Sequence, residues 1–448
     1  MSMVVKNNMS AVSTLNTLNK NSSALASSLK KVSSGMKINS AADDASGYAI
    51  SERMRVQIRG LDQANQNTQN GTSMMKVAEG AVSSTVDILK TLKEKVINAA
   101  NDTNTDSDRA TIQKELDQSI DQINDNANVT YNGKYLVDGS HNSKVQTTTT
   151  AMTNESLFSA TTGSTAFSAM QDRNGNSLNI NSLDTVTISF VHEGKTYSAT
   201  ASAQKGLNDL LKAANSAFKK EDKTGKAATT DAFKDTVSEG SYIGKDIAGD
   251  TVHTADEKTA LTITAAGSGV SNQISGITIS VTNTQGQVQK SANAVLDNFS
   301  ESVRAQNKSD DNAINLQVGT KANQSIRVGL TDMRAEALGL QSSTGQTIQI
   351  GTQQQANAAV NVLDNAVQKA LDQQTTIGSV QSRLSYTSSN LTTASENVQA
   401  SESTIRDADM AKEMTEYTKN NVLLQAAQSM LAQAQANQSS SSVLSLLQ

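Results

Sequence analysis

The chain has 448 residues, of which 36% are hydrophobic and 3% aromatic, and its formal net charge is −5 at pH 7. So few bulky apolar residues exclude one large, wide core, and the mild charge gives no indication of a nucleic-acid partner. Cys and Pro are both absent, which excludes disulfides and thiolate metal sites and suits very long helices, because Pro inside a helix costs about 3 kcal/mol.

The N-terminal stretch carries an apolar stripe that ends near Gly35. Its gaps alternate between three and four residues when Ser22 is counted as the one polar position, which is the seam spacing of a helix packed lengthwise on another. The stripe comprises Leu15, Leu18, Leu25, Leu29, Val32 and Met36. Five lysines and no acidic residue precede Asp43. We interpret these lysines as a solvated helix face, with an anionic partner as the alternative.

A second, longer helix is predicted from Asp43-Asp44 to about Ala100, because this pair can cap and charge-match a helix start. Its heptad stripe is Met54, Ile58, Leu61, Thr68, Met75, Val82, Val86, Leu89 and Val96. A third helix is predicted to begin near Thr105, with one apolar face formed by Ile112, Leu116, Ile120 and Ile123.

The C-terminal part has the most regular period in the chain. Apolar residues recur every seventh position: Leu363, Ala370, Ile377, Leu384, Leu391, Val398 and Ile405. Such a run predicts a long helix packed along partner helices. The order of elements is therefore helix, helix, insert, helix, helix, and we expect the two ends of the chain to pair.

The middle, from about 140 to 300, holds all six Phe residues and short runs of period-2 alternation. Strands are predicted at 186–190, 196–198, 261–263 and 277–281, with a turn at Glu193-Gly194 and a short helix at 206–218. A further hairpin is predicted from 314–318 and 325–328. The fold class is thus mainly α, with long antiparallel coiled-coil-like helices from both ends and an inserted α+β or β-rich variable domain.

Residues for chemistry are scarce. His192-Glu193 could open an H-E-x-x-H zinc motif, but Thr196 stands where the second His is needed. His141 and His253 are isolated in the polar middle. Asp43-Asp44 and the pair Asp407 and Asp409 border predicted helix starts, so capping is favoured over acid–base catalysis. We expect no enzyme activity, no cofactor and no metal.

Residues 420–448 contain no charged side chain, and isolated leucines punctuate a Gln, Ala and Ser background. Ordering each residue costs about 1–2 kcal/mol of conformational entropy, which so little apolar area cannot offset alone. We infer that the terminal segments become ordered only when they assemble with other copies.

Several motifs resemble those of bacterial flagellins. Residues 32–50 read VSSGMKINSAADDASGYAI, residues 405–413 read IRDADMAKE, and residues 443–447 read VLSLL. The segments 326–340 (IRVGLTDMRAEALGL) and 431–437 (LAQAQAN) fit the same family. Together these motifs cover about 1–140 and 300–448, in the order that the family has.

This resemblance implies a filament subunit built in shells. Segments 1–42 and 406–448 would form the inner domain, 43–140 and 301–405 the helical shell with a β-hairpin, and 141–300 the outer variable domain. It also implies a homopolymer located outside the cell in the flagellum, and contacts with filament cap and hook-associated proteins. Export would run through the type III apparatus with a chaperone on the C-terminal segment. The start of the chain lacks an apolar signal-peptide core, so we expect no cleaved signal peptide.

One departure concerns the vertebrate Toll-like receptor. In flagellins that the receptor recognises, a helix stretch reads approximately L-Q-R-x-R-E-L-A, whereas residues 89–96 here read LKTLKEKV. Glu94 and Glu115 match acidic contact positions, but Thr91 replaces an arginine and Lys95 replaces a leucine. The resemblance therefore implies weak or absent recognition.

Contacts between subunits and within the helical core are predicted for one set of apolar residues. The set is Leu15, Leu18, Leu25, Leu29, Val32, Ile58, Leu61, Leu89, Leu363, Ile377, Leu384, Leu391, Val398, Ile405, Leu423, Met430, Leu431, Leu444 and Leu447. The alternative function is a hook–filament junction protein, which has similar ends. A coiled-coil signalling receptor would need membrane spans, and the sequence has no apolar run long enough for one.

Overall fold

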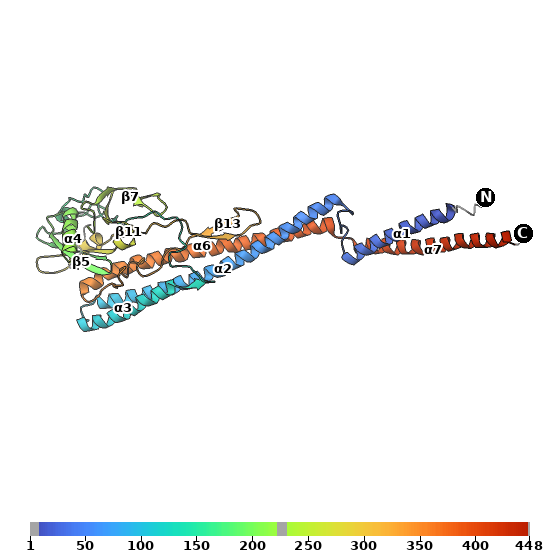
Figure 1. Cartoon of the computed structure of the whole chain (residues 1–448). Coiled ribbons are helices and arrows are strands. Elements are labelled where there is room, and N and C mark those ends of the chain that lie inside the picture. The colour runs from blue at the N-terminus through green and yellow to red at the C-terminus, as the bar shows by residue number, and fades with distance from the viewer. Residues whose placement is uncertain (1–8, 222–230, 447–448) are drawn as a thin grey trace. The chain divides into compact units, whose positions relative to one another are not determined.

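A computed structural model describes residues 9–221 and 231–446 (Figure 1). The helices are α1 (Met9–Ser34), α2 (Ala45–Ala99), α3 (Asp106–Ala127), α4 (Leu207–Glu221), α5 (Lys290–Leu296), α6 (Gln353–Arg406) and α7 (Met410–Leu446). The fold is mainly helical with a strand-rich insert, which confirms the predicted fold class. No helix within the described residues is long and apolar enough to cross a lipid bilayer.

The chain divides into two compact units, and the division cuts α2 and α6 rather than falling at their ends. The first unit comprises Met1–Thr68, Gln317–Gln324 and Tyr386–Gln448. The second comprises Gln69–Leu316 and Ser325–Ser385. In Figure 1, α1 and α7 of the first unit run side by side, as do the paired stretches of α2 and α6 in each unit.

In the second unit, α3 lies antiparallel to α2. Lys95 of α2 pairs with Glu115 of α3 at 3.0 Å, and Asn126 near the end of α3 donates to Ser84 at 3.1 Å. The start of α3 is set by a capping box, in which Thr105 and Asp108 satisfy each other's backbone N–H groups. The predicted start of this helix near Thr105 is confirmed.

The described residues contain thirteen strands, and most of them belong to the insert. They are β1 (Thr130–Tyr131), β2 (Lys134–Tyr135), β3 (Ala151–Asn154), β4 (Thr185–His192), β5 (Lys195–Ser202), β6 (Ser238–Gly240), β7 (Tyr242–Lys245), β8 (Thr251–His253), β9 (Ala260–Thr264), β10 (Ile274–Thr282), β11 (Ser300–Val303), β12 (Ile314–Gln317) and β13 (Ser325–Val328). Two antiparallel sheets have the orders β10-β4-β5 and β11-β3-β9-β6. The pairs β1-β2, β7-β8 and β12-β13 form separate hairpins.

The predicted turn at Glu193-Gly194 joins β4 to β5. Both residues have positive φ, +48° and +72°, which are the signs of the tight hairpin turn whose twist matches that of the strands. The strands predicted at 261–263 and 277–281 lie within β9 and β10, and the helix predicted at 206–218 is α4. Strands β1, β2, β3, β6, β7, β8 and β11 were not predicted from the sequence.

Aromatic residues hold the insert together. Phe190 on β4 lies 4.7 Å from Phe233 and 5.5 Å from Tyr197, measured between ring centroids. Both Phe190 and Phe233 are buried, and α4 supplies apolar residues to the same core. Such edge and stacked ring contacts add to the free energy gained by burying their area. The insert thus has its own core, separate from the helical seams.

The two ends of the insert pair with each other. Val145 and Ser309 exchange backbone hydrogen bonds at 3.1 Å, and Thr148 N–H donates to the Gln306 carbonyl at 3.2 Å. The chain therefore enters and leaves the insert through adjacent segments, which lets the helices on either side continue as if uninterrupted.

The predicted hairpin is β12 and β13, and small residues of α2 make room for it. A Cβ placed on Gly71 would lie 2.7 Å from Leu316 of β12, and in the first unit one on Gly60 would lie 2.9 Å from Thr320. Asn67 also donates to the Gln317 carbonyl at 3.2 Å. Glycine at these two positions lets the hairpin lie directly on the helix.

Asp297, at the end of α5, gives a testable pH dependence. Its carboxylate accepts the Ile279 N–H of β10 at 2.9 Å, and burial raises the pKa of Asp297 to about 6 from 3.8. Between pH 4 and 6 the folded chain holds more protons than the unfolded chain, so stability falls as pH rises through that window. We expect Asp297→Asn to stabilise β10 at pH 8 by on the order of 1–2 kcal/mol, with the gain vanishing near pH 4. Hydrogen exchange of the β10 amides under native conditions measures this.

Asp256→Asn is the matched control for this experiment. The Arg173 guanidinium bound to Asp256 lowers the pKa of that carboxyl, so its contribution to stability is present at neutral pH and lost on acidification. This variant should be less stable than the parent at pH 8. Equal exchange rates for Asp297→Asn and the parent at pH 8 would contradict the account of Asp297.

Candidate assembly surface

The two ends of the chain form an antiparallel helix pair. Lys31 of α1 lies 3.5 Å from Glu413 of α7, and the side chain of Asn21 donates to the Leu423 carbonyl at 3.2 Å. Asn420 donates to Ser28 at 3.1 Å, between those two contacts. The predicted pairing of the chain ends is thus confirmed.

The α1–α7 pair buries very little apolar surface. Leu18, Leu25 and Val32 on α1 and Leu431 on α7 are half-buried between the helices. Within Met9–Ser34 the one buried residue is Ser28, and Ala427 is the buried counterpart among the α7 side chains described. Two helices alone cannot enclose a core, so this pair is stable only with further surfaces against it.

Large apolar side chains also point away from this pair. Leu15 is 45% exposed, Leu29 51%, Leu423 42% and Met430 64%. Others on the same two helices were not predicted from the sequence, namely Met9, Val12, Met410, Met414 and Val422. The side chain of Leu444 and the whole of Leu447 lie outside the described residues. Exposed apolar surface on this scale is typical of a protein–protein interface.

A compact turn fixes the junction between α1 and α2 against the end of α6. Lys37 N–H donates to the Arg406 carbonyl at 2.7 Å, and Ala408 N–H donates to the Gly35 carbonyl at 2.9 Å. Gly35 has φ of +71°, a left-handed conformation that ends α1. Arg406 is buried and binds Glu52 at 2.7 Å, which lowers the pKa of that carboxyl.

Of the four aspartates predicted to cap helix starts, Asp44 and Asp409 do so, and Asp43 and Asp407 do not. Asp44 accepts the N–H groups of Ser46 and Gly47 at the start of α2, and Asp409 accepts that of Ala411 at the start of α7. Asp43 instead accepts the Asn39 and Ser40 N–H groups of the preceding turn, which lowers its pKa. Asp407 accepts the Ser403 hydroxyl at the end of α6.

Within each unit, the stretches of α2 and α6 meet along a seam. Of the predicted residues, Leu61, Leu89, Leu363, Ile377, Leu384 and Leu391 are buried, and Ile58, Val398 and Ile405 are half-buried. A second row on α2 was missed by sequence reasoning, although it also recurs every seventh residue: Ala64, Gly71, Ala78, Thr85, Leu92 and Ala99. All of these residues except Leu92 are small, and Gly71 lies against Leu316 of β12. The regular spacing of the row was the available signal.

Polar contacts fix the antiparallel register on both sides of the unit boundary. In the first unit, Arg55 lies 3.2 Å from Glu402, and Ser395 donates to Asp62 at 3.1 Å. In the second unit, Lys93 pairs with Asp364, and Gln381 donates to Glu79 at 2.7 Å. These exposed ion pairs add little stability, but they select one alignment of the helices.

The three histidines lie apart from these surfaces. His192 packs edge-on against Phe218 at 5.0 Å, and burial lowers the pKa of His192 to about 4. His253 lies beside Tyr242, and His141 contacts the Asn312 carbonyl. Among the described residues, no three His, Asp or Glu side chains are placed to hold a metal ion.

Comparison with known proteins gives matches at both ends and over the full length. Residues 5–142 match the bacterial flagellin N-terminal helical region, and residues 360–447 match the bacterial flagellin C-terminal helical region. The chain is 31% identical to a flagellin of Clostridium tyrobutyricum, covering 96% of this chain and 99% of that one. It is 29% identical to a flagellin of Bacillus subtilis and 30% identical to polar flagellin A of Vibrio parahaemolyticus, each covering 99–100% of both chains.

Leu384 tests the seam. It is fully buried on α6, so Leu384→Lys would place an unpaired charge among apolar side chains. We expect a loss of on the order of 3–5 kcal/mol in the free energy of unfolding of the second unit, measured by urea denaturation with circular dichroism. Ser382→Lys, on an exposed position of the same helix, should change it little. A similar small effect from both variants would contradict the seam.

Proposed function

Because the chain belongs to the bacterial flagellin family and is a structural subunit of the flagellar filament, we propose that it enters the filament by folding its terminal helices against copies already in place. The filament lies outside the cell, so the assembled chain is extracellular. The relatives that match over the whole chain are named flagellins, so the junction-protein alternative has no better support. The family is structural, and we propose no catalytic role.

The observation that carries this proposal is the incomplete core of α1 and α7. Both helices keep large apolar side chains exposed while their mutual contact buries almost none. Each leucine that a neighbouring subunit covers would contribute about 1.5–3 kcal/mol. The free energy needed to hold these helices therefore comes from other copies, which couples folding to assembly.

Burial in the single chain divides the predicted contact residues into two groups. The buried residues of α2 and α6, such as Leu89 and Leu384, hold the subunit itself together. The exposed residues Leu15, Leu29 and Met430 are available to neighbours. We propose that this second group makes the contacts between subunits in the innermost part of the filament.

The filament geometry follows from the asymmetry of these surfaces. Apolar residues on α1 and α7 differ from those exposed elsewhere, so copies meet head-to-tail, and such contacts propagate as a helical polymer unless the rotation closes a ring. We propose that 1–42 and 406–448 form the inner domain, 43–140 and 301–405 the helical shell, and 141–300 the outer domain. The separate core of the insert supports assigning it to the outside.

Export and partner proteins fit the same physical picture. A chain without Cys or Pro has no disulfides to form and no slow prolyl isomerisation, which suits export in an unfolded state through the type III apparatus. The uncharged C-terminal segment exposes leucines before assembly. An export chaperone that binds this segment would shield them from water. Filament cap and hook-associated proteins would contact the same terminal helices.

Seeded polymerisation tests the proposal. Purified full-length monomer is mixed with sheared filament fragments and followed by light scattering and negative-stain electron microscopy. Long filaments from the full chain, and none from a chain lacking residues 420–448, are expected because the deleted segment completes the inner contacts. Met430→Lys should slow elongation, whereas Gln435→Lys, on an exposed polar position of α7, should not. Normal elongation by the truncated chain would contradict coupled folding.

Weak or absent recognition by the Toll-like receptor is a second, finer proposal. Thr91 is exposed on α2, and Lys95 forms an ion pair with Glu115 at 3.0 Å. This pairing neutralises one of the two acidic positions that match receptor contacts, so a partner arginine would find Glu115 already bound.

The double variant Thr91→Arg with Lys95→Leu restores the family pattern and frees Glu115. We expect at least about a tenfold gain in signalling in a reporter-cell assay with monomer, since interface arginines and buried aliphatics carry much of the binding energy. Lys90→Leu, an exposed change on the same helix, serves as the control. No gain from the double variant would contradict the proposal.

A further inference from the structure

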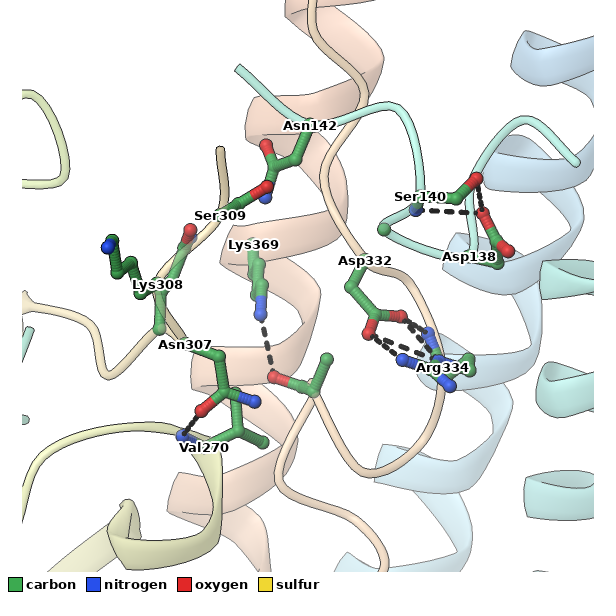
Figure 2. Close-up of a pocket in the computed structure, with 13 residues that line it drawn as sticks. Asp138, Ser140, Asn142, Val270, Asn307, Lys308, Ser309, Asp332, Arg334 and Lys369 are labelled. Atoms are coloured by element: carbon green, nitrogen blue, oxygen red, sulfur yellow. Dashed lines mark hydrogen bonds and ion pairs between the residues drawn. The ribbon is translucent and has the colours of Figure 1, made fainter. Parts of the chain in front are cut away.

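A cavity of about 360 Å³ lies in the second unit beside α6. Its walls come from the segment around Asp138, from residues 306–309, and from the segment that carries Asp332 and Arg334. Figure 2 shows Lys369 extending from α6 between Asn307 on one side and Asp332 on the other. The volume is at the lower end of the range for small-molecule sites.

Lys369 is a buried cation with no ion-pair partner among the described residues, and the charges of Glu301 and Asp332 counter only part of the effect of burial on its pKa. Its ammonium donates to the Ala337 carbonyl at 2.6 Å, and among the described residues this is the one hydrogen bond and no carboxylate forms an ion pair with it. Burial lowers the pKa of Lys369 to about 8, so the amine is still mainly charged at pH 7. A buried charge is costly unless it is paired. Two of its three N–H donors therefore lack an acceptor.

The carboxylates around the cavity are already engaged. Asp332 is bound in a fork by the Arg334 guanidinium, with N–O distances of 3.0 and 2.6 Å. Asp138 accepts the N–H and hydroxyl of Ser140 at 3.0 and 2.6 Å. The lining carries the cations Lys308, Arg334 and Lys369 against these two carboxylates, an excess of one positive charge. The cavity therefore favours an anion.

Gln306 lines the same cavity and carries a buried, unused acceptor. Its backbone is held to Thr148 by hydrogen bonds of 2.9 and 3.2 Å, so the side chain is positioned from a fixed point. Its Oε1 atom is buried and has no partner among the described residues. A buried unpaired acceptor costs about 1–3 kcal/mol, and a ligand O–H group would remove that cost.

We propose that this cavity binds a small oxyanion that also carries a hydroxyl group, with an anionic oxygen on Lys369 Nζ and the O–H donated to Gln306 Oε1. Hydrogen phosphate and small hydroxylated phosphate esters have this chemistry. Sulfate has the same shape and charge but carries no O–H at neutral pH, so it can satisfy Lys369 and not Gln306. All residues of this site lie within one unit of one chain.

The test is isothermal titration calorimetry of the full-length monomer at pH 7 and constant ionic strength. Inorganic phosphate should bind about tenfold or more tightly than sulfate, as one recovered hydrogen bond is worth roughly that factor. Lys369→Met should abolish binding of both anions, and Gln306→Leu should reduce phosphate to the level of sulfate. Lys212→Met, on an exposed position of α4, is the matched control and should change neither.

Glycerol phosphate distinguishes the source of the phosphate. Tighter binding than inorganic phosphate assigns the site to phosphate esters, and weaker binding assigns it to the free ion. Equal binding of phosphate and sulfate by the parent chain, or phosphate binding that survives Lys369→Met, would overturn the proposal. Circular dichroism checks that each variant folds, and Gln306→Leu alone decides the hydroxyl requirement if Lys369→Met does not fold.

Discussion

The spacing of seam residues along α2 and α6 is the constraint on which the subunit depends. Apolar or small side chains recur every seventh residue on both helices, so within each unit each helix keeps one face toward its partner. One Pro inside either helix would remove a backbone hydrogen bond and turn the seam away from its partner. The absence of Pro and the length of the helices are therefore two consequences of one requirement.

Helices α1 and α7 carry the same kind of apolar stripe, but within the described residues each packs against one partner helix only. Their stripes are therefore only partly buried. Leu18 and Leu25 face that partner, while Leu15 and Leu29 remain exposed. These exposed apolar residues belong to a hydrophobic core that the single subunit does not complete. Under the proposed coupling of folding to assembly, other copies complete this core, so free chains do not form a stable finished structure before they reach the growing end.

The sequence was sufficient for the helices because their signal is local and repeated. It predicted Leu384 and Leu89 within the seam, and Thr105 at the start of α3. It could not separate Leu15 from Leu18, because a stripe shows which side of a helix is apolar and not how far the partner reaches around it. Strand β3 was missed for a different reason. It is buried along its whole length, and its polar residues Thr153 and Asn154 are satisfied by hydrogen bonds to distant segments.

Two buried polar residues of α6, Gln373 and Lys369, hold the segment that follows the β12–β13 hairpin. Gln373 stands at a position where the period calls for an apolar residue, and its Oε1 accepts both the N–H and the hydroxyl of Thr331. One turn earlier, Lys369 binds the Ala337 carbonyl of the same connecting segment. A buried amide or amine can form its hydrogen bond to a fixed backbone group in only one alignment, whereas leucines tolerate a shift by a turn. These two residues therefore set the register in which the segment following the β12–β13 hairpin docks on α6, at the cost of an amide nitrogen on Gln373 that finds no partner among the described residues.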